Sequence, residues 1–224
     1  MPLREQLDRK IADLRLSVIT MGQRVDEQLK QALKAVETLD VKLARQVISD
    51  DQKINADRYA IEDTCCKMIV TEQPTARDLR TIIGALYIIV DLERIGDKAK
   101  DIAEVVHDVS KSSNWPRPRE IRQMGNLTGT MLRESMQAYA DGNIELARQV
   151  AEHYREIHPL YVIVLNQTIE HMAEVKKEKK VTATYGILQV AQHLDRVGDL
   201  TTNVAERVVY IATGNLTEMN VPPQ

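Results

Sequence analysis

The sequence predicts an all-α protein of six helices, arranged as two tandem antiparallel three-helix bundles. Three observations support this prediction: apolar residues recur every three or four positions, turn-forming residues are scarce, and the second half of the chain repeats the first. The 224 residues include only 9 glycines and 7 prolines, too few for the many tight turns of a β-sandwich or barrel. A hydrophobic content of 43% is sufficient for a buried core.

The first half contains three helical patterns separated by short breaks. One long amphipathic helix is expected over the first forty residues, where apolar side chains step by three and four. Asp40 opens a second helix. This helix ends before Pro74, because proline cannot continue a helix and moves the preceding residue away from helical angles. The third helix is expected from Thr75 to about Ser110.

The second half has the same pattern after a linker. Residues 111–119 contain two prolines and two serines and predict this linker. A fourth helix is expected up to Tyr139, before a turn at residues 141–143. The fifth helix extends to the lysine- and glutamate-rich stretch 176–180, and the sixth continues from there to Thr213.

The two halves are copies of one another. Residues 84–106 and 186–208 share nine identities in 23 aligned positions. The segment LARQV occurs at both 43–47 and 146–150. Such a duplication indicates two similar bundles, and two copies are too few to imply a solenoid.

These boundaries divide the chain into two bundles and a tail. We assign residues 1–112 to the first bundle, 113–214 to the second and 215–224 to a flexible tail. Gly214 predicts the end of the sixth helix. Pro159 lies inside the fifth pattern and predicts a kink or break just before it.

The most specific feature of the repeat is an acidic row that occurs once in each copy. Its members are spaced four residues apart: Glu93, Asp97 and Asp101 in the first copy, and Asp195, Asp199 and Asn203 in the second. On a helix that turns 100° per residue, each row lies within an arc of about 80°. The apolar positions lie on the other side, so we expect the rows to point away from the bundle core. Like charges at this spacing destabilise a helix by about 0.2–0.5 kcal/mol per pair.

We interpret the rows as sites for divalent cations, because a bound ion would screen that repulsion. Carboxylate and amide oxygens favour hard cations, and the expected metal is Fe, Mn or Mg. Asn203 is a neutral ligand, so the second site is expected to be weaker. Gly96 and Gly198 beside the rows would let another helix or a ligand approach closely. The alternative is a solvated acidic face that survives from the duplication without a function.

Both motifs resemble those of a known family. The segments ERIGD at 93–97 and DRVGD at 195–199 resemble the paired acidic motifs of the PhoU family, and EQPTARDLR at 72–80 resembles the segment before the first motif. The resemblance covers essentially the full chain. It implies a six-helix regulator of phosphate uptake, with iron or other metal clusters on the motif carboxylates in some members. This chain departs from the family pattern at Asp195 and Asn203.

The resemblance also implies partners and a location. PhoU proteins are cytoplasmic, mostly homodimeric, and restrain a phosphate ABC transporter and the sensor kinase of the phosphate-starvation response. The expected partners are therefore the ATPase subunit of such a transporter, a phosphate-sensing histidine kinase and a second copy of the chain. Contact with a membrane is expected only through these proteins.

Composition excludes several other classes. A net charge of −3 and an aromatic content of 4% argue against a nucleic-acid binder. The longest apolar run, residues 82–90, is far shorter than the about 20 residues of a membrane span. The chain becomes charged directly after its start, so no signal peptide is expected. The adjacent Cys65 and Cys66 lack zinc spacing and fit a cytoplasmic protein.

We expect a protein that is not an enzyme, because the sequence contains no nucleophile motif or phosphate-binding loop. The competing prediction is a carboxylate-bridged, metal-dependent oxidase or hydrolase on the same helices. Glu104 and His107 have the spacing of a di-iron ligand pair, but the second copy has Glu206 and Val209 at these positions. A third possibility is a helical adaptor that binds no metal.

Overall fold

The structure is a computed structural model that describes residues 3–110, 118–174, 178–216 and 219. It contains six α-helices, which confirms the predicted class: α1 (Leu3–Thr38), α2 (Val41–Glu72), α3 (Ala76–Val109), α4 (Arg119–Asp141), α5 (Ile144–Glu174) and α6 (Glu178–Thr213). The predicted bundle boundary and most of the predicted linker and tail lie outside the described residues. Within those residues, no helix is long and apolar enough to span a membrane.

The helix ends follow from local chemistry, as predicted. The Asp40 carboxylate accepts hydrogen bonds from two backbone N–H groups in the first turn of α2, at 2.9 and 3.0 Å. The residue after α2, Gln73, has a left-handed φ of 47° and immediately precedes Pro74. Gly142 and Gly214 follow α4 and α6 with φ angles of 65° and 80°, which glycine adopts without strain.

The predicted break before Pro159 is wrong, because α5 is continuous from Ile144 to Glu174. Proline has no backbone N–H, so the helix loses one hydrogen bond to the preceding turn. Ile157 and Val164, on either side of the proline, are fully buried in the core. Their packing anchors α5 in the core on both sides of the proline, and the alternative outcome, a kink, stays a prediction.

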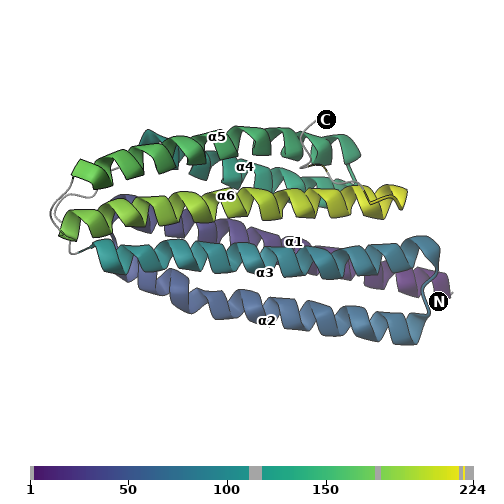
Figure 1. Cartoon of the computed structure of the whole chain (residues 1–224). Coiled ribbons are helices and arrows are strands. Elements are labelled where there is room, and N and C mark those ends of the chain that lie inside the picture. Colours follow the sequence, from purple (N-terminus) through teal and green to yellow (C-terminus); the bar gives the residue numbers. More distant parts are fainter. Residues whose placement is uncertain (1–2, 111–117, 175–177, 217–218, 220–224) are drawn as a thin grey trace.

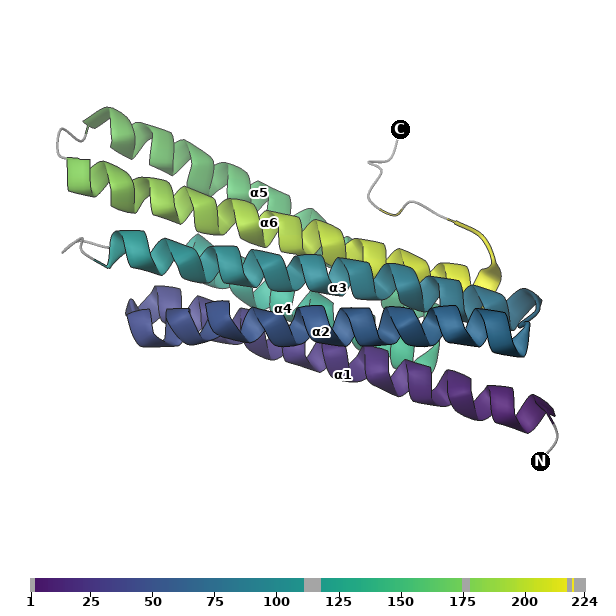
Figure 2. The same ribbon diagram turned by 90° about the horizontal axis from the view of Figure 1, so that it is seen from below.

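The helices form two layers (Figures 1 and 2). In one layer α5, α6, α3 and α2 lie side by side in this order. In the other, α1 packs on α2 and α3, and α4 packs on α5 and α6. Each half of the chain is therefore a group of three mutually packed helices, and the two groups meet through α3 with α6 and through α1 with α4.

An internal two-fold relationship connects the two groups. Gly22 of α1 lies against Met136 of α4, and Gly125 of α4 lies against Leu33 of α1. The two LARQV segments are offset by 103 residues. Adding 103 to the residue numbers Gly22 and Leu33 gives Gly125 and Met136, so the two contacts are equivalent by the repeat. The contact between α1 and α4 is thus self-complementary, like the interface of a symmetric dimer.

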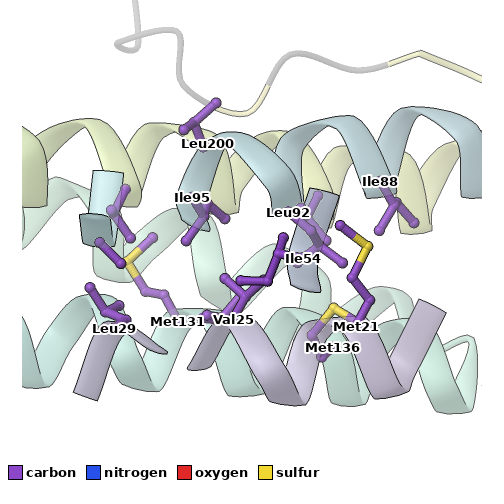
Figure 3. Close-up of a cluster of buried hydrophobic side chains, with 14 of the residues drawn as sticks. Met21, Val25, Leu29, Ile54, Ile88, Leu92, Ile95, Met131, Met136 and Leu200 are labelled. Atoms are coloured by element: carbon purple, nitrogen blue, oxygen red, sulfur yellow. The ribbon is translucent and has the colours of Figure 1, made fainter. Parts of the chain in front are cut away.

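A single hydrophobic core extends through both groups. Figure 3 shows its central part, where side chains from five helices meet: Met21, Val25 and Leu29 of α1, Ile54 of α2, Ile88, Leu92 and Ile95 of α3, Met131 and Met136 of α4, and Leu200 of α6. Because both groups contribute to one core, the separation into residues 1–112 and 113–214 stays a prediction.

Candidate functional site

The first acidic row lies on α3 and faces the seam between α3 and α2. The Nη1 atom of Arg58 on α2 lies 3.0 Å from Oε1 of Glu93, whose side chain is 18% exposed. One turn further, Asp97 is close enough to the buried Asp51 of α2 for the two charges to repel. Neither Glu93 nor Asp97 is fully buried, as expected for a row that points away from the bundle core. Both residues face α2, because α2 packs over that edge of α3.

Asp97 is surrounded by more negatively than positively charged side chains. Burial raises the pKa of Asp97, and the neighbouring charges of Glu93 and Asp51 raise it further, whereas Lys100 opposes them. The Nζ atom of Lys100 lies 3.6 Å from Oδ2 of Asp51. Three carboxylates thus share two cations, Lys100 and Arg58. Because Arg58 also lies 3.9 Å from Glu62, the seam carries at least one uncompensated negative charge when all three acids are ionised.

Two buried amide oxygens, one on α1 and one on α2, lie near Asp51 in the chain or in space, and neither belongs to the predicted rows. Gln28 of α1 is 5% exposed, and its Nε2 lies 3.4 Å from Oδ1 of Asp51. Among the described residues, neither Oε1 of Gln28 nor Oδ1 of Asn55 accepts a hydrogen bond, although both atoms are buried. Such an oxygen costs about 1–3 kcal/mol when it has no partner. The signal in the sequence is that Asp51 and Asn55 have the same four-residue spacing as the acidic row.

The glycines beside the rows allow close packing, which confirms that prediction. A Cβ added to Gly96 would lie only 3.1 Å from both Oε1 of Gln28 and Cδ1 of Ile54. A Cβ added to Gly198 would lie 2.8 Å from Cδ1 of Ile157 on α5. Glycine at these positions lets the neighbouring helices approach the backbone next to the carboxylates.

The second row faces the equivalent seam between α6 and α5. Oδ1 of Asp195 lies 3.4 Å from Nδ1 of His158 on α5. Burial raises the pKa of Asp195 and the charge of Asp199 adds to this, while His158 opposes both. Asp199 forms an ion pair with Arg196 on its own helix.

The neighbours of the second row differ from those of the first. Tyr154 of α5 packs against this row, and burial together with the two carboxylates raises the pKa of Tyr154 to about 12. By the offset of 103, Tyr154 and His158 occupy the positions of Asp51 and Asn55 in the first copy. The second seam therefore offers fewer oxygen atoms than the first, and an imidazole in addition.

The third member of each row lies elsewhere, at the junction of the two groups. Asp101 is 2.5 Å from Nζ of Lys98, and its Oδ2 lies 3.6 Å from Nδ1 of His193 on α6. The side-chain amide of Asn203 faces Asp91 on α3 and opposes the rise that burial causes in the pKa of that carboxyl. The structure thus places four of the six predicted residues in the two seams, and separates Asp101 and Asn203 from them.

The donor set at the first seam fits a hard divalent cation. Its atoms are carboxylate and amide oxygens, the ligands that Mg²⁺ and Mn²⁺ prefer. In the described ranges, no group of three or more histidine, cysteine, aspartate or glutamate side chains is placed to hold one ion. An ion at the first seam would therefore depend on the amide oxygens of Gln28 and Asn55 as well as on carboxylates.

Comparison with known proteins decides the family. The PhoU domain matches residues 18–106 and 121–208, once in each half of the chain. The chain belongs to the PhoU family. A PhoU homolog of Clostridium acetobutylicum is 31% identical over 218 residues, which cover 97% of this chain and 99% of the homolog. PhoU of Escherichia coli K12 is 29% identical over 209 residues, which cover 93% and 86% of the two chains. Both relatives are named as accessory proteins of the phosphate-specific transport system.

Solved PhoU structures have the same fold. The crystal structure of PhoU from Streptococcus pneumoniae matches with a TM-score of 0.88 at 29% identity, over 95% of this chain and 99% of that one. PhoU from Pseudomonas aeruginosa matches with a TM-score of 0.88 at 30% identity, over 93% and 99% of the two chains. The six-helix arrangement of this PhoU-family protein is therefore similar to that of its relatives over nearly its full length.

Proposed function

We propose that this protein is a non-enzymatic regulator of phosphate uptake and phosphate-starvation signalling. One observation carries the proposal: both copies of the PhoU domain are present, and the match to accessory proteins of phosphate-specific transport extends over nearly the whole chain. In this role it restrains a phosphate ABC transporter through the ATPase subunit, and the histidine kinase that signals phosphate starvation. We further propose that it acts in the cytoplasm as a homodimer and reaches the membrane only through these partners.

The competing enzymatic function has less support. A di-iron oxidase of the ferritin type needs two Glu-x-x-His pairs that point into a bundle. The first copy has Glu104 and His107, but both side chains are exposed. In the second copy the histidine position is Val209, which is 5% exposed and part of the core.

We also propose that the seam between α2 and α3 is the stronger of two divalent-cation sites. Glu93, Asp97 and Asp51 would supply the negative charge, and Gln28 and Asn55 would supply neutral oxygens. The bound ion would compensate the excess charge and give the two amide oxygens a partner. Asp195 and Asp199 form the weaker second site, where Tyr154 and His158 replace two of the oxygen ligands.

Deleting the gene in the organism that encodes it tests the regulatory proposal. We expect the transcripts of phosphate-starvation genes to rise when phosphate is abundant, because the restraint on the kinase is lost. Returning the wild-type gene should restore repression. Normal repression in the deletion strain would contradict the proposal. Affinity purification from phosphate-replete cells should recover the transporter ATPase subunit or the kinase with the protein.

A further inference from the structure

A groove of about 460 Å³ lies between α1 and α4, where the two three-helix groups meet. Ile187 and Val190 of α6 line it together with residues of α1 and α4. Its volume is typical of small-molecule sites, which measure about 300–1,000 Å³. No member of either acidic row lines this groove, so the proposed regulatory and metal sites do not account for it.

Two ion pairs cross the groove from α4 to α1. Nη1 of Arg133 lies 3.0 Å from Oδ1 of Asp26, and Nη2 of Arg122 lies 2.8 Å from Oε1 of Glu37. The two pairs are 11 residues apart on each helix. At the rise of an α-helix this separation is about 16 Å. The ion pairs thus bracket a long, narrow space.

The dimensions suit a small, elongated molecule. The groove has a volume of about 460 Å³ and lies between two ion pairs that are about 16 Å apart. An extended aliphatic chain fits a space of this length.

The floor of the groove is apolar. Leu33 of α1 and Ile121 of α4 line it and are half-buried, so part of their apolar surface is open to a ligand. Gly125 and Gly129 of α4 also line it. Their missing side chains bring the α4 backbone into the floor. Burial of a hydrocarbon chain against these residues is favourable because it removes apolar surface from water.

The rim of the groove is basic. Four cations and two carboxylates line it, which gives an excess of two positive charges: Lys30, Lys34, Arg122 and Arg133 against Asp26 and Glu37. Asp26 is only 9% exposed and already binds both Lys30, at 2.6 Å, and Arg133. Lys34 forms no ion pair with any residue that the structure describes. The ammonium of Lys34 is thus available to an anionic group in the groove.

We propose that this groove binds a small amphipathic anion, an aliphatic chain that ends in a carboxylate or a phosphate. The chain lies on the apolar floor between the two ion pairs, and the head group contacts Lys34. Charge complementarity selects anions over neutral or cationic amphiphiles of the same length.

Calorimetric titration of the purified full-length protein tests the proposal. The probes are decanoate, decyl phosphate and the neutral 1-decanol, each below its aggregation concentration. We expect saturable binding of one equivalent of at least one of the two anions, with 1-decanol at least fivefold weaker. The preferred head group identifies the ligand as a carboxylate or a phosphate ester. Absence of saturable binding to both anions, or equally tight binding of 1-decanol, would overturn the proposal.

Two variants locate the site. Lys34→Glu reverses an exposed charge at the rim and should weaken anion binding at least fivefold, whereas the matched Lys67→Glu on α2, also exposed, should not. Asn126→Trp places a large side chain at the exposed edge of the groove and should block the chain. Circular dichroism verifies that each variant is folded. Binding that neither groove variant weakens would show that the anion binds elsewhere. Neither result bears on the proposed cation sites, because the groove and the acidic rows share no residue.

Discussion

Asn203 of α6 faces Asp91 of α3 across the seam that joins the two three-helix groups, and its side-chain amide opposes the rise that burial causes in the pKa of Asp91. Asp101 and His193 form the equivalent contact, with 3.6 Å between Oδ2 and Nδ1. The alignment of α3 with α6 has an offset of 102 residues. By this offset, His193 is the position equivalent to Asp91, and Asn203 is the position equivalent to Asp101. The same contact therefore occurs twice between α3 and α6. In one copy the acid, Asp91, faces an amide, and in the other the acid, Asp101, faces an imidazole.

Replacing Asp91 with Asn should stabilise the protein at pH 7. Burial raises the pKa of Asp91 to about 6 from an ordinary value of 3.8, against the opposing charges of Arg94 and Arg207. The folded state therefore keeps a proton that the unfolded state releases, and stability falls as the pH rises from about 4 to about 6. The size of this pKa shift sets an upper limit of about 3 kcal/mol for the increase in the free energy of unfolding that Asp91→Asn gives at pH 7. At pH 4 the increase should be small.

Urea unfolding of the wild type and the variant at both pH values measures this difference. Asp63→Asn is the matched control, because the Asp63 side chain is 60% exposed and pairs only within its own helix. An equal effect of Asp91→Asn at pH 4 and pH 7 would show that the charge of Asp91 is not the cause.

Asn203→Asp should destabilise the protein at neutral pH. The change removes the amide that faces Asp91 and places a second carboxylate beside a buried one. We expect a loss of about 1–3 kcal/mol in the free energy of unfolding, more than the about 0.2–0.5 kcal/mol of a like-charge pair along one helix. Because Asn203 faces Asp91 and not the α5–α6 seam, excess Mn²⁺ should not restore the loss. Thermal unfolding with chelator and with Mn²⁺ measures both effects, and recovery with Mn²⁺ would place position 203 in a cation site.

Mn²⁺ or Fe²⁺ should raise the melting temperature of the wild type, because a ligand that binds only the folded state stabilises it by about 2.7 kcal/mol at 100 times its Kd. Asp97→Asn should remove most of this increase in melting temperature. Asp199→Asn should remove a smaller part of it. Without metal, Asp97→Asn should instead stabilise the protein at pH 7, because it removes the excess charge beside Glu93 and Asp51.

Differential scanning calorimetry with and without chelator measures both effects of Asp97→Asn: the smaller metal-dependent increase in melting temperature and the higher stability without metal. Asp8→Asn on the exposed side of α1 is the control. If the double variant Asp97→Asn with Asp199→Asn keeps the full metal-dependent increase, the assignment of the seams is wrong. Gln28→Leu should also reduce the increase if its amide oxygen is a ligand.

Gly84→Ala should destabilise the contact between α3 and α6. A Cβ at Gly84 would overlap with Cγ1 and Cδ1 of Ile211. Overpacking of this kind costs about 1–3 kcal/mol. The additional change Ile211→Ala should recover part of the loss, as a double-mutant cycle in urea would show. At Gly142, where an added Cβ meets nothing within 4 Å and φ is 65°, alanine should cost only backbone strain, and Ile211→Ala should recover none of it.

The sequence by itself determined the six helices and most of their ends. Helical periodicity, the Asp40 cap and the stops at Pro74 and Gly214 depend on residues within one or two turns, so they can be recognised without the fold. The break before Pro159 was the exception. Local hydrogen bonding predicts it, but the buried Ile157 and Val164 are fixed by contacts with residues far away in the sequence.

The tertiary structure decided what each acidic residue faces. Periodicity determines which side chains share one face of a helix, but not which other helix covers that face. The packing of α2 on α3 brings Asp51 to Asp97, and α1 adds Gln28 beside Asp51. The packing of α3 on α6 draws Asp101 and Asn203 away to the junction between the groups. Each helix face spans more than one neighbour, so residues that form one row in the sequence contact different helices in the fold.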